Sequence, residues 1–233
     1  MSDKIALVTG ASSGIGAATA AALSAAGWHV AAGARRVSRL GDFFPLELDV
    51  TSRESVQDAV SRTVAEFGGL DLVVNSAGIM LTGPILDADT AEWDRMVRTN
   101  LLGALYVTHA ALPHLLARKG TLVQISSTSG RTASAMGGVY AATKFGLNAF
   151  TESLRQEVTA RGVRVVTIEP GMVDTELPSH ISDPAMRSMA TSLYGSLRTL
   201  DAADVAAAVL YAVDQPAHVS VNEILLRPTD QVQ

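Results

Sequence analysis

Short apolar runs rich in β-branched side chains alternate along the chain with longer stretches of helical periodicity. The apolar runs cover residues 4–8, 29–34, 44–50, 70–75, 121–126, 164–169 and 221–226. Most of them are continuously apolar rather than alternating, which is typical of strands covered on both faces. The helical patterns cover residues 14–26, 53–67, 91–117, 139–160 and 201–213.

Alternating strands and helices predict an α/β fold with right-handed crossovers. We expect a Rossmann-like, doubly wound parallel sheet of about seven strands with helices on both faces. The second and third strands are separated only by residues 35–43, which is too short for a helical crossover. Residues 37–43 are therefore predicted to form a turn or a single helical turn. No polar linker or repeat divides the chain, so residues 1–233 are predicted to form one domain.

Composition narrows the classes of function. The chain has 233 residues, of which 48% are hydrophobic and 18% charged, and its net charge of -5 gives no basic surface for nucleic acid. It contains no cysteine, which excludes disulfides, thiolate nucleophiles and cysteine zinc sites. The five histidines lack metal-ligand spacing, so no metal is expected. With neither a signal peptide nor a membrane-spanning segment in the pattern, a cytoplasmic location is predicted.

A glycine-rich stretch follows the first predicted strand and opens the first predicted helix. Glycines there permit a tight turn and close approach of the backbone to a pyrophosphate, while the helix N-terminus offers free N–H groups. The spacing has one residue more than the usual dinucleotide fingerprint, and a plain strand-to-helix turn that needs glycine is the alternative. After Thr9, the candidate cofactor residues of this turn are Gly10, Ser12, Ser13, Gly14, Ile15 and Gly16.

Tyr140 and Lys144 lie four residues apart near the start of the helix at 139–160, so both side chains share one face. An ammonium group close to a phenol favours the phenolate and is expected to lower its pKa from about 10. Ser127 ends the fifth predicted strand, at the sheet edge where open α/β folds hold ligands. Ser126 is the competing choice, because strand alternation turns it the other way. Each pattern alone also occurs by chance.

In this order and together, the motifs resemble those of the short-chain dehydrogenase/reductase family over nearly the whole chain. The glycine turn, Ser127, Tyr140 and Lys144 match, and Asn100 matches the fourth member of the family's catalytic set. Three further stretches match the family's adenine contact, its Asn-Asn-Ala-Gly stretch and its nicotinamide-side segment. They are Asp49-Val50, Asn75-Ser76-Ala77-Gly78 and Pro170-Gly171-Met172-Val173-Asp174-Thr175.

The resemblance implies a role for each of these residues during carbonyl reduction. Ser127 would hold the carbonyl, and Tyr140 would give it a proton as hydride arrives at carbon. Lys144 would hold the ribose hydroxyls and lower the pKa of Tyr140, while Asn100 would hold a water connecting Lys144 to solvent. Thr175 and the backbone at Val173 would fix the carboxamide of the cofactor.

The end of the second predicted strand bears on which nicotinamide cofactor is used. In a doubly wound fold this point faces the adenosine ribose, where an acid holds a 2′-hydroxyl and would repel a 2′-phosphate. By resemblance, Ala34 stands in place of that acid, and Arg35 and Arg36 follow. Paired guanidinium hydrogen bonds suit a phosphate, so NADP(H) is predicted. The alternative is a solvated pair of surface arginines.

The segment at about 176–198 is predicted to cover the substrate. Met186, Met189 and Leu193 recur at helical spacing, which indicates a small lid helix. Arg187 or Arg198 is a candidate anchor for a substrate carboxylate, and His180 is kept open as a contact, although all three also suit a solvated loop. The ending at 221–229 resembles relatives that act on small hydroxy acids, hydroxy amino acids or amino alcohols, or on the matching ketones and aldehydes.

Other functions remain compatible with this pattern. An acyl-carrier-protein ketoreductase shares the motifs, although the C-terminal stretch lacks its glycine-rich ending. An enoyl reductase and a nucleotide-sugar epimerase are further readings, and a non-catalytic NADP(H)-binding regulator would not need Asn100, Ser127, Tyr140 and Lys144. By analogy with relatives, a homotetramer or homodimer is expected through the two long helices. Leu105, Tyr106, Phe145 and Phe150 suit such an interface, and they also suit a core.

Overall fold

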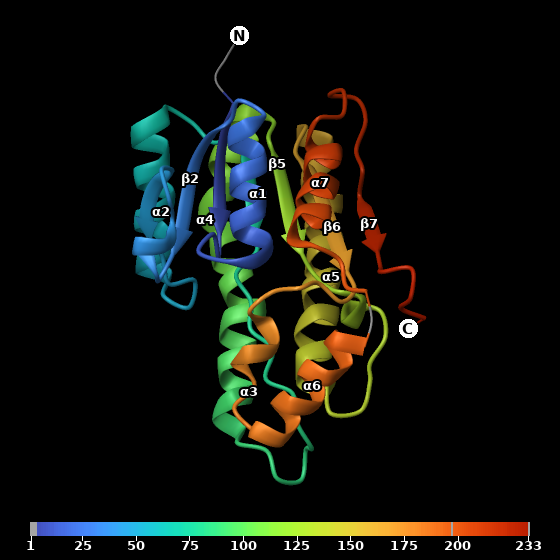
Figure 1. Cartoon of the computed structure of the whole chain (residues 1–233). Helices are drawn as coiled ribbons and strands as arrows, with labels where there is room; N and C mark the ends of the chain where they lie inside the picture. The colour runs from blue at the N-terminus through green and yellow to red at the C-terminus, as the bar shows by residue number, and fades with distance from the viewer. Residues whose placement is uncertain (1–3, 197, 233) are drawn as a thin grey trace.

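Seven parallel strands form one twisted sheet in the computed structural model, which describes residues 4–196 and 198–232 (Figure 1). The order across the sheet is β3-β2-β1-β4-β5-β6-β7. The strands are β1 (Ile5–Thr9), β2 (His29–Ala34), β3 (Phe44–Glu47), β4 (Leu72–Asn75), β5 (Thr121–Ile125), β6 (Arg164–Pro170) and β7 (Glu223–Leu226). The chain order reverses between β1 and β4, and the crevice at such a reversal is where open α/β sheets bind ligands.

The continuous apolar runs reflect burial on both faces of the sheet. In β1, Ala6 and Val8 pack into the core on one face, whereas Ile5 and Leu7 pack into the core on the other. β4 repeats this division, with Val74 on the first face and Val73 on the second. Because both sets of side chains are covered, neither strand needs polar residues, and the run stays apolar throughout.

Helices cover both faces, as expected for a doubly wound fold (Figure 1). The first face carries α1 (Gly14–Ala25) and α7 (Ala202–Val213), which pack against each other. The second face carries α2 (Arg53–Phe67), α4 (Ala104–Arg118) and α5 (Gly138–Val158), whose buried side chains share a core with β1, β4, β5 and β6. The predicted α/β class, sheet and two helical layers are confirmed.

The short connection between β2 and β3 forms a single 3-10 turn, η1 (Val37–Arg39), as its length predicted. The long helix expected over 91–117 is interrupted. α3 (Thr90–Met96) passes into a π-helical turn, η2 (Val97–Gly103), before α4 begins. Periodicity alone did not reveal this turn. The predicted strand over 44–50 is shorter than expected, because β3 ends at Glu47.

The segment after β6 lies beyond the carboxyl ends of the strands (Figure 1). It contains the 3-10 turn η5 (Leu177–His180) and the helix α6 (Pro184–Ser196), which confirms the helix expected from the spacing of Met186, Met189 and Leu193. Two further 3-10 turns, η3 (Thr128–Gly130) and η4 (Thr159–Arg161), flank α5 in the sequence. Among the described helices, none is both long and apolar enough to span a membrane.

Candidate active site

The glycine turn joins β1 to α1 in a conformation that glycine alone tolerates. Gly10 has φ +67 and Gly14 has φ +52, values that L-residues with side chains rarely adopt. A Cβ atom on Gly16 would lie 2.4 Å from the Gly10 carbonyl oxygen, so the backbone packs too closely there for any side chain. The turn therefore brings bare backbone to the rim of the sheet, as pyrophosphate binding requires.

A cavity of about 990 Å³ opens along the carboxyl edge of the sheet. Most of the residues predicted to bind cofactor lie in its wall. They are Gly10, Ser12, Ser13, Gly14, Ile15, Gly16, Arg35, Arg36, Asp49, Val50, Ala77, Gly78, Tyr140, Lys144, Pro170, Gly171, Val173 and Thr175. The cavity runs without a break from the end of β2 to α6, so its size and lining fit an extended dinucleotide together with a small second molecule.

Asn75 was predicted to contact the cofactor, and the structure places its side chain elsewhere. Its Nδ2 donates to the Ala104 carbonyl at 3.2 Å and to the Thr108 hydroxyl at 3.3 Å, inside the helical layer. Asn75 is absent from the described residues that line the cavity. As the last residue of β4, it follows strand alternation toward α4.

Thr9 holds the neighbouring loop in place. Its Oγ1 accepts hydrogen bonds from the backbone N–H groups of Ser76 and Ala77, at 3.1 and 3.2 Å. These bonds join the end of β1 to the end of β4 at the point where the strand order reverses. Sequence analysis placed Thr9 in the motif without assigning it a role, because only the strand order makes β4 its neighbour.

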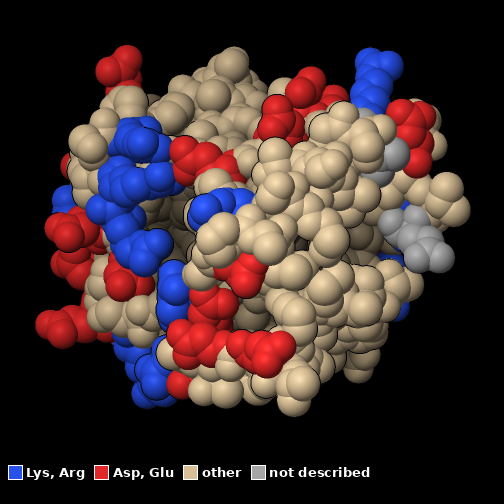
Figure 2. Space-filling model, turned by 60° about the horizontal axis from the view of Figure 1, so that its bottom comes forward, with Lys and Arg blue, Asp and Glu red and all other residues tan. Residues whose placement is uncertain are grey.

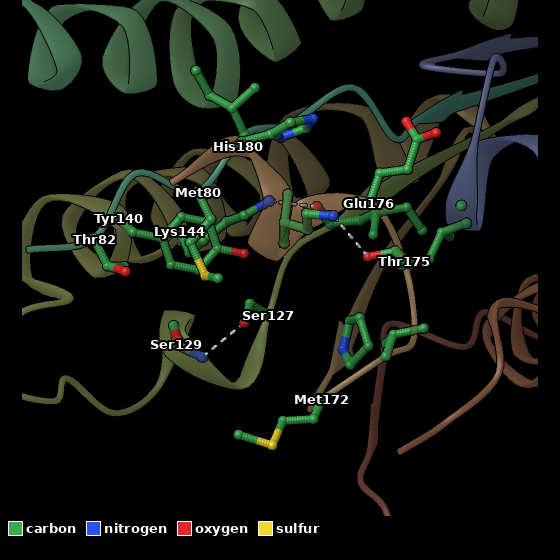
Figure 3. A pocket seen from close by; sticks show the side chains of 18 of the residues that line it. Met80, Thr82, Ser127, Ser129, Tyr140, Lys144, Met172, Thr175, Glu176 and His180 are labelled. Carbon is green, nitrogen blue, oxygen red and sulfur yellow. Dashed lines mark hydrogen bonds between the residues drawn. The ribbon is translucent and has the colours of Figure 1, made fainter. Parts of the chain in front are cut away.

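Ser127, Tyr140 and Lys144 come together in the cavity wall (Figure 3). The Ser127 hydroxyl is close enough to Tyr140 to lower its pKa, and Ser127 Oγ accepts a hydrogen bond from the backbone N–H of Ser129 at 3.0 Å. Ser126, the competing choice, also borders the cavity, but its hydroxyl is buried and lacks a hydrogen-bond partner among the described residues. The geometry therefore favours Ser127 as the partner of Tyr140.

Lys144 lies one helical turn after Tyr140 on α5. Its Nζ donates to the Ile125 carbonyl at 2.9 Å and lies 5.8 Å from the centre of the Tyr140 ring. Both residues are buried, with 8% of Tyr140 and 5% of Lys144 exposed. The expected juxtaposition on one face of the helix is present.

The pKa values differ from the sequence expectation. Burial raises the pKa of Tyr140 to about 12, an effect that the hydrogen bond from Ser127 reduces and the nearby Tyr194 increases. Burial alone lowers the pKa of Lys144 to about 8. The pKa of Tyr140 is therefore raised rather than lowered as expected from its lysine neighbour, because the low-dielectric surroundings penalise the charged forms of both side chains.

This burial predicts a measurable pH dependence of stability. Between about pH 8 and 10.5 the unfolded chain keeps a proton on Lys144 that the folded chain has lost, so the free energy of unfolding rises with pH across that window. The expected rise is at most about 3 kcal/mol. Above pH 10 the raised pKa of Tyr140 acts in the opposite direction, because the folded chain then keeps the proton that the unfolded chain loses.

Urea unfolding at pH 8 and pH 10 checks this expectation. The wild-type protein should gain stability between the two values relative to Lys144→Met, which has no titrating group at that position. Equal changes in the two proteins would show that Lys144 keeps an ordinary pKa in the folded state.

Asn100 lies in the π-helical turn behind the cavity wall and is 1% exposed. Its Oδ1 accepts from the Ile79 N–H and its Nδ2 donates to the Ile79 carbonyl, both at 2.8 Å, and Nδ2 also reaches the Thr143 hydroxyl at 3.3 Å. The side chain thus ties η2 to α5 and to the loop after β4. π-Helical turns are frequent at functional sites, although Asn100 itself is not among the described lining residues.

At the end of β2, Arg36 contacts the glycine turn directly. Its Nη2 donates to the Ser13 hydroxyl at 2.9 Å and its Nε to the Ser12 hydroxyl at 3.3 Å. Arg35 is exposed at the cavity wall and forms no ion pair with any residue that the structure describes. Figure 2 shows Lys and Arg side chains gathered along one side of a hollow on this face of the molecule, with acidic side chains among them.

Methionine side chains are frequent in the lining of the cavity. Five of the seven methionines in the sequence line it, together with Leu193 and Tyr194 of α6. The five are Met80, Met136, Met172, Met186 and Met189. His180 lines the cavity as well, whereas neither Arg187 nor Arg198 appears among the described lining residues. Arg187 donates instead to the Ile181 carbonyl at 3.3 Å.

Two residues near the chemistry were not singled out from the sequence. The Gln231 side chain accepts a hydrogen bond from the Met172 N–H at 2.8 Å and packs against Gly171. Tyr194, on the lid helix, is close enough to Tyr140 to raise its pKa. Both reach the site from elements distant in the sequence, and no local pattern signals such contacts.

Comparisons with known proteins agree with this geometry. The family model described as short chain dehydrogenase matches residues 4–185. An uncharacterized oxidoreductase of Staphylococcus aureus strain MW2 is 40% identical over 238 residues, covering 98% of each chain. A solved structure of serine dehydrogenase, in its closed form complexed with NADP+, is 34% identical with a TM-score of 0.92, covering 98% of this chain and 96% of the other.

A second solved structure, of alcohol dehydrogenase from Thermococcus sibiricus complexed with 5-hydroxy-NADP, is 29% identical with a TM-score of 0.86. It covers 98% of this chain and 97% of its own. The curated relative and the solved structures match nearly the whole chain, and the family model matches residues 4–185 within it. On these grounds the protein belongs to the short-chain dehydrogenase family and is an oxidoreductase of that family.

Proposed function

We propose that this oxidoreductase transfers a hydride between NADP(H) and a carbonyl or secondary alcohol, with Tyr140 as general acid and base. The observation that carries the proposal is that Ser127, Tyr140 and Lys144 line the same cavity as the glycine turn. A proton donor, a second hydroxyl and a dinucleotide-sized groove open into one space, which is what carbonyl reduction requires.

The chain's own residues divide the work of binding and proton transfer. Gly10, Ser12 and Ser13 would hold the pyrophosphate, and Val173 and Thr175 the carboxamide. When bound, the cofactor supplies or accepts the hydride. Ser127 would donate a hydrogen bond to the substrate carbonyl and so polarise it.

Burial favours the neutral form of Tyr140, which holds the proton that the carbonyl oxygen needs. In the oxidation direction the same residue must lose that proton, and a protonated Lys144 beside it would stabilise the phenolate. Asn100 would contribute by fixing η2 against α5, and the water-mediated link from Lys144 to solvent remains a proposal from the family resemblance.

The preference for NADP(H) over NAD(H) is supported by charge at the end of β2. Ala34 offers no carboxylate to a ribose hydroxyl, while Arg35 and Arg36 are exposed at the cavity wall. A guanidinium group suits a 2′-phosphate because it forms paired charged hydrogen bonds. The solved structures with NADP+ and 5-hydroxy-NADP support the same preference.

Two substrate classes are favoured by different observations. The likeness to serine dehydrogenase supports a small hydroxy acid or hydroxy amino acid. The five methionines support a ketone, aldehyde or amino alcohol with an apolar substituent, because thioether side chains are flexible and adapt to varied apolar shapes. Arg227, which also lines the cavity, would be the cation available to a carboxylate there.

A substrate panel tests the function and separates these classes. Consumption of NADPH is followed optically with aliphatic and aromatic ketones, aldehydes and keto acids, and formation of NADPH is followed with serine and other hydroxy acids. We expect turnover with NADPH at least tenfold above that with NADH, and fastest for uncharged carbonyls with apolar substituents. Turnover confined to serine-like acids would contradict the assignment of an apolar substrate. If no compound of the panel were turned over, the proposed carbonyl or alcohol oxidoreductase activity would be contradicted.

An acyl-carrier-protein ketoreductase and a non-catalytic NADP(H)-binding regulator are the alternatives. Tyr140 and Ser127 oppose the regulator, because binding alone does not require a buried proton donor. For assembly we propose a homotetramer or homodimer formed through α4 and α5. Phe145 on α5 supports it, being 43% exposed, whereas Tyr106 and Phe150 are partly buried and pack against the core.

A further inference from the structure

A carboxylate competes for the arginines at the proposed 2′-phosphate site. Glu176 Oε2 accepts from Arg36 Nη2 at 2.9 Å, and its Oε1 accepts from Arg39 Nη1 at 3.0 Å. Arg36 uses the same nitrogen, Nη2, for the Ser13 hydroxyl. Glu176 comes directly after Thr175 and is the N-cap residue of η5, so it belongs to the segment that covers the cavity (Figure 3).

The contact with the arginines changes the pKa of the Glu176 carboxyl group. The two arginines lower the pKa of Glu176, with Arg36 having the larger effect. Burial lowers the pKa of His180, at the end of η5, while the nearby charge of Glu176 raises it and that of Arg36 lowers it. The Glu176 carboxylate therefore occupies two of the arginines near the end of β2, Arg36 and Arg39, whose N–H groups would otherwise be available to a phosphate.

A 2′-phosphate and the Glu176 carboxylate have the same requirements. Both need guanidinium N–H donors, and both are negatively charged, so they repel each other if they share one arginine. Arg36 has a fixed planar fork of donors, and two of its nitrogens are already engaged by Ser12, Ser13 and Glu176. Arg35 is left as the guanidinium without an ion pair to any described residue.

We propose that Glu176 is a specificity-determining residue that weakens binding of the 2′-phosphate by holding Arg36 and Arg39. The inference rests on the proposed NADP(H) preference and assigns an opposing role to one carboxylate beside it. The adenosine ribose of NADH carries no 2′-phosphate and does not need these arginines. Glu176 should therefore affect the binding of NADPH but not that of NADH.

Binding of adenosine nucleotides to the full chain, measured by calorimetry, tests this without turnover. The probes are 2′,5′-ADP, which carries the 2′-phosphate, and 5′-AMP, which lacks it. In Glu176→Gln, Kd for 2′,5′-ADP should fall about tenfold at low salt, and Kd for 5′-AMP should stay within about twofold. The gain should shrink at high salt, because exposed charges are screened. Glu66→Gln removes an exposed charge outside the cavity lining and should change neither Kd.

The dependence on Arg36 is tested in a double-mutant cycle. In an Arg36→Gln background, Glu176→Gln should lose most of its effect on 2′,5′-ADP. An unchanged or weakened affinity in the single Glu176→Gln variant would overturn the proposal, because Glu176 would then be neutral or would orient Arg36 for the phosphate. If the wild-type protein bound 2′,5′-ADP no more tightly than 5′-AMP, the proposed preference for NADP(H) would itself be refuted. A wild-type preference without a Glu176 effect would overturn this inference alone.

Discussion

Replacing Tyr140 with phenylalanine should lower kcat about 10³-fold, within the range that general acid-base catalysis contributes. The ring would still pack against Ile79, Leu81 and Met96 in its core cluster, so folding and the shape of the cavity should persist. What is lost is the hydroxyl that holds the transferable proton in the cavity wall. The measurement is kcat with the best carbonyl of the panel, alongside Kd for NADPH from a fluorescence titration, which should change less than threefold.

A matched tyrosine serves as the control. Tyr106 on α4 lies outside the cavity lining and stacks beneath Arg53, 4.8 Å from its guanidinium carbon. Tyr106→Phe also removes a phenol hydroxyl, but one outside the cavity, and this variant should retain near-wild-type turnover. Activity of Tyr140→Phe within tenfold of the wild type would refute Tyr140 as the proton donor. Parallel losses in both variants would point to a general effect on folding.

Exchanging the end of β2 should reverse the cofactor preference. In Ala34→Asp with Arg35→Ser, a carboxylate would accept from the ribose hydroxyls and repel a 2′-phosphate, while one guanidinium would be removed. The ratio of kcat/KM with NADPH to that with NADH should fall at least 100-fold, mainly through KM for NADPH. Steady-state kinetics with both cofactors at a fixed carbonyl concentration measures this ratio.

Arg161→Ser is the appropriate control, because Arg161 is exposed in η4, which leads into the amino end of β6, away from the carboxyl edge that forms the cavity. In Arg161→Ser, the ratio of kcat/KM with NADPH to that with NADH should equal the wild-type ratio. If the β2 double variant kept the wild-type ratio, the arginines at the end of β2 would be ordinary surface charges, and the determinant of cofactor choice would have to lie elsewhere in the cavity.

Local sequence patterns predicted the structural features that depend on neighbours within a few residues. The glycine spacing between residues 10 and 16 indicated the bare turn, since a Cβ atom on Gly16 meets the Gly10 carbonyl within the same turn. The four-residue spacing of Tyr140 and Lys144 placed them on one helical face. The continuous apolar runs indicated buried parallel strands, and the spacing of Met186, Met189 and Leu193 indicated the lid helix.

Features set by surroundings rather than by spacing were missed or misjudged. Spacing suggested that Lys144 would make Tyr140 more acidic, whereas burial by elements from across the chain has the opposite net effect. The π-helical turn around Asn100 interrupts a helix whose apolar periodicity looked regular. Asn75 fitted a family motif, but its amide turns toward α4, which lies more than 25 residues later in the sequence.

For this protein, the order of residues was enough to establish the fold class, the pyrophosphate turn and the Tyr140–Lys144 pair, because each depends on contacts within one turn or one strand. Tertiary structure decided which groups meet across the carboxyl edge of the sheet. It brought Glu176 to Arg36, 140 positions away in the chain, Gln231 to Met172, and five methionines to one cavity wall. Such meetings depend on strand order and on the packing of whole helices, and no short stretch of sequence encodes them.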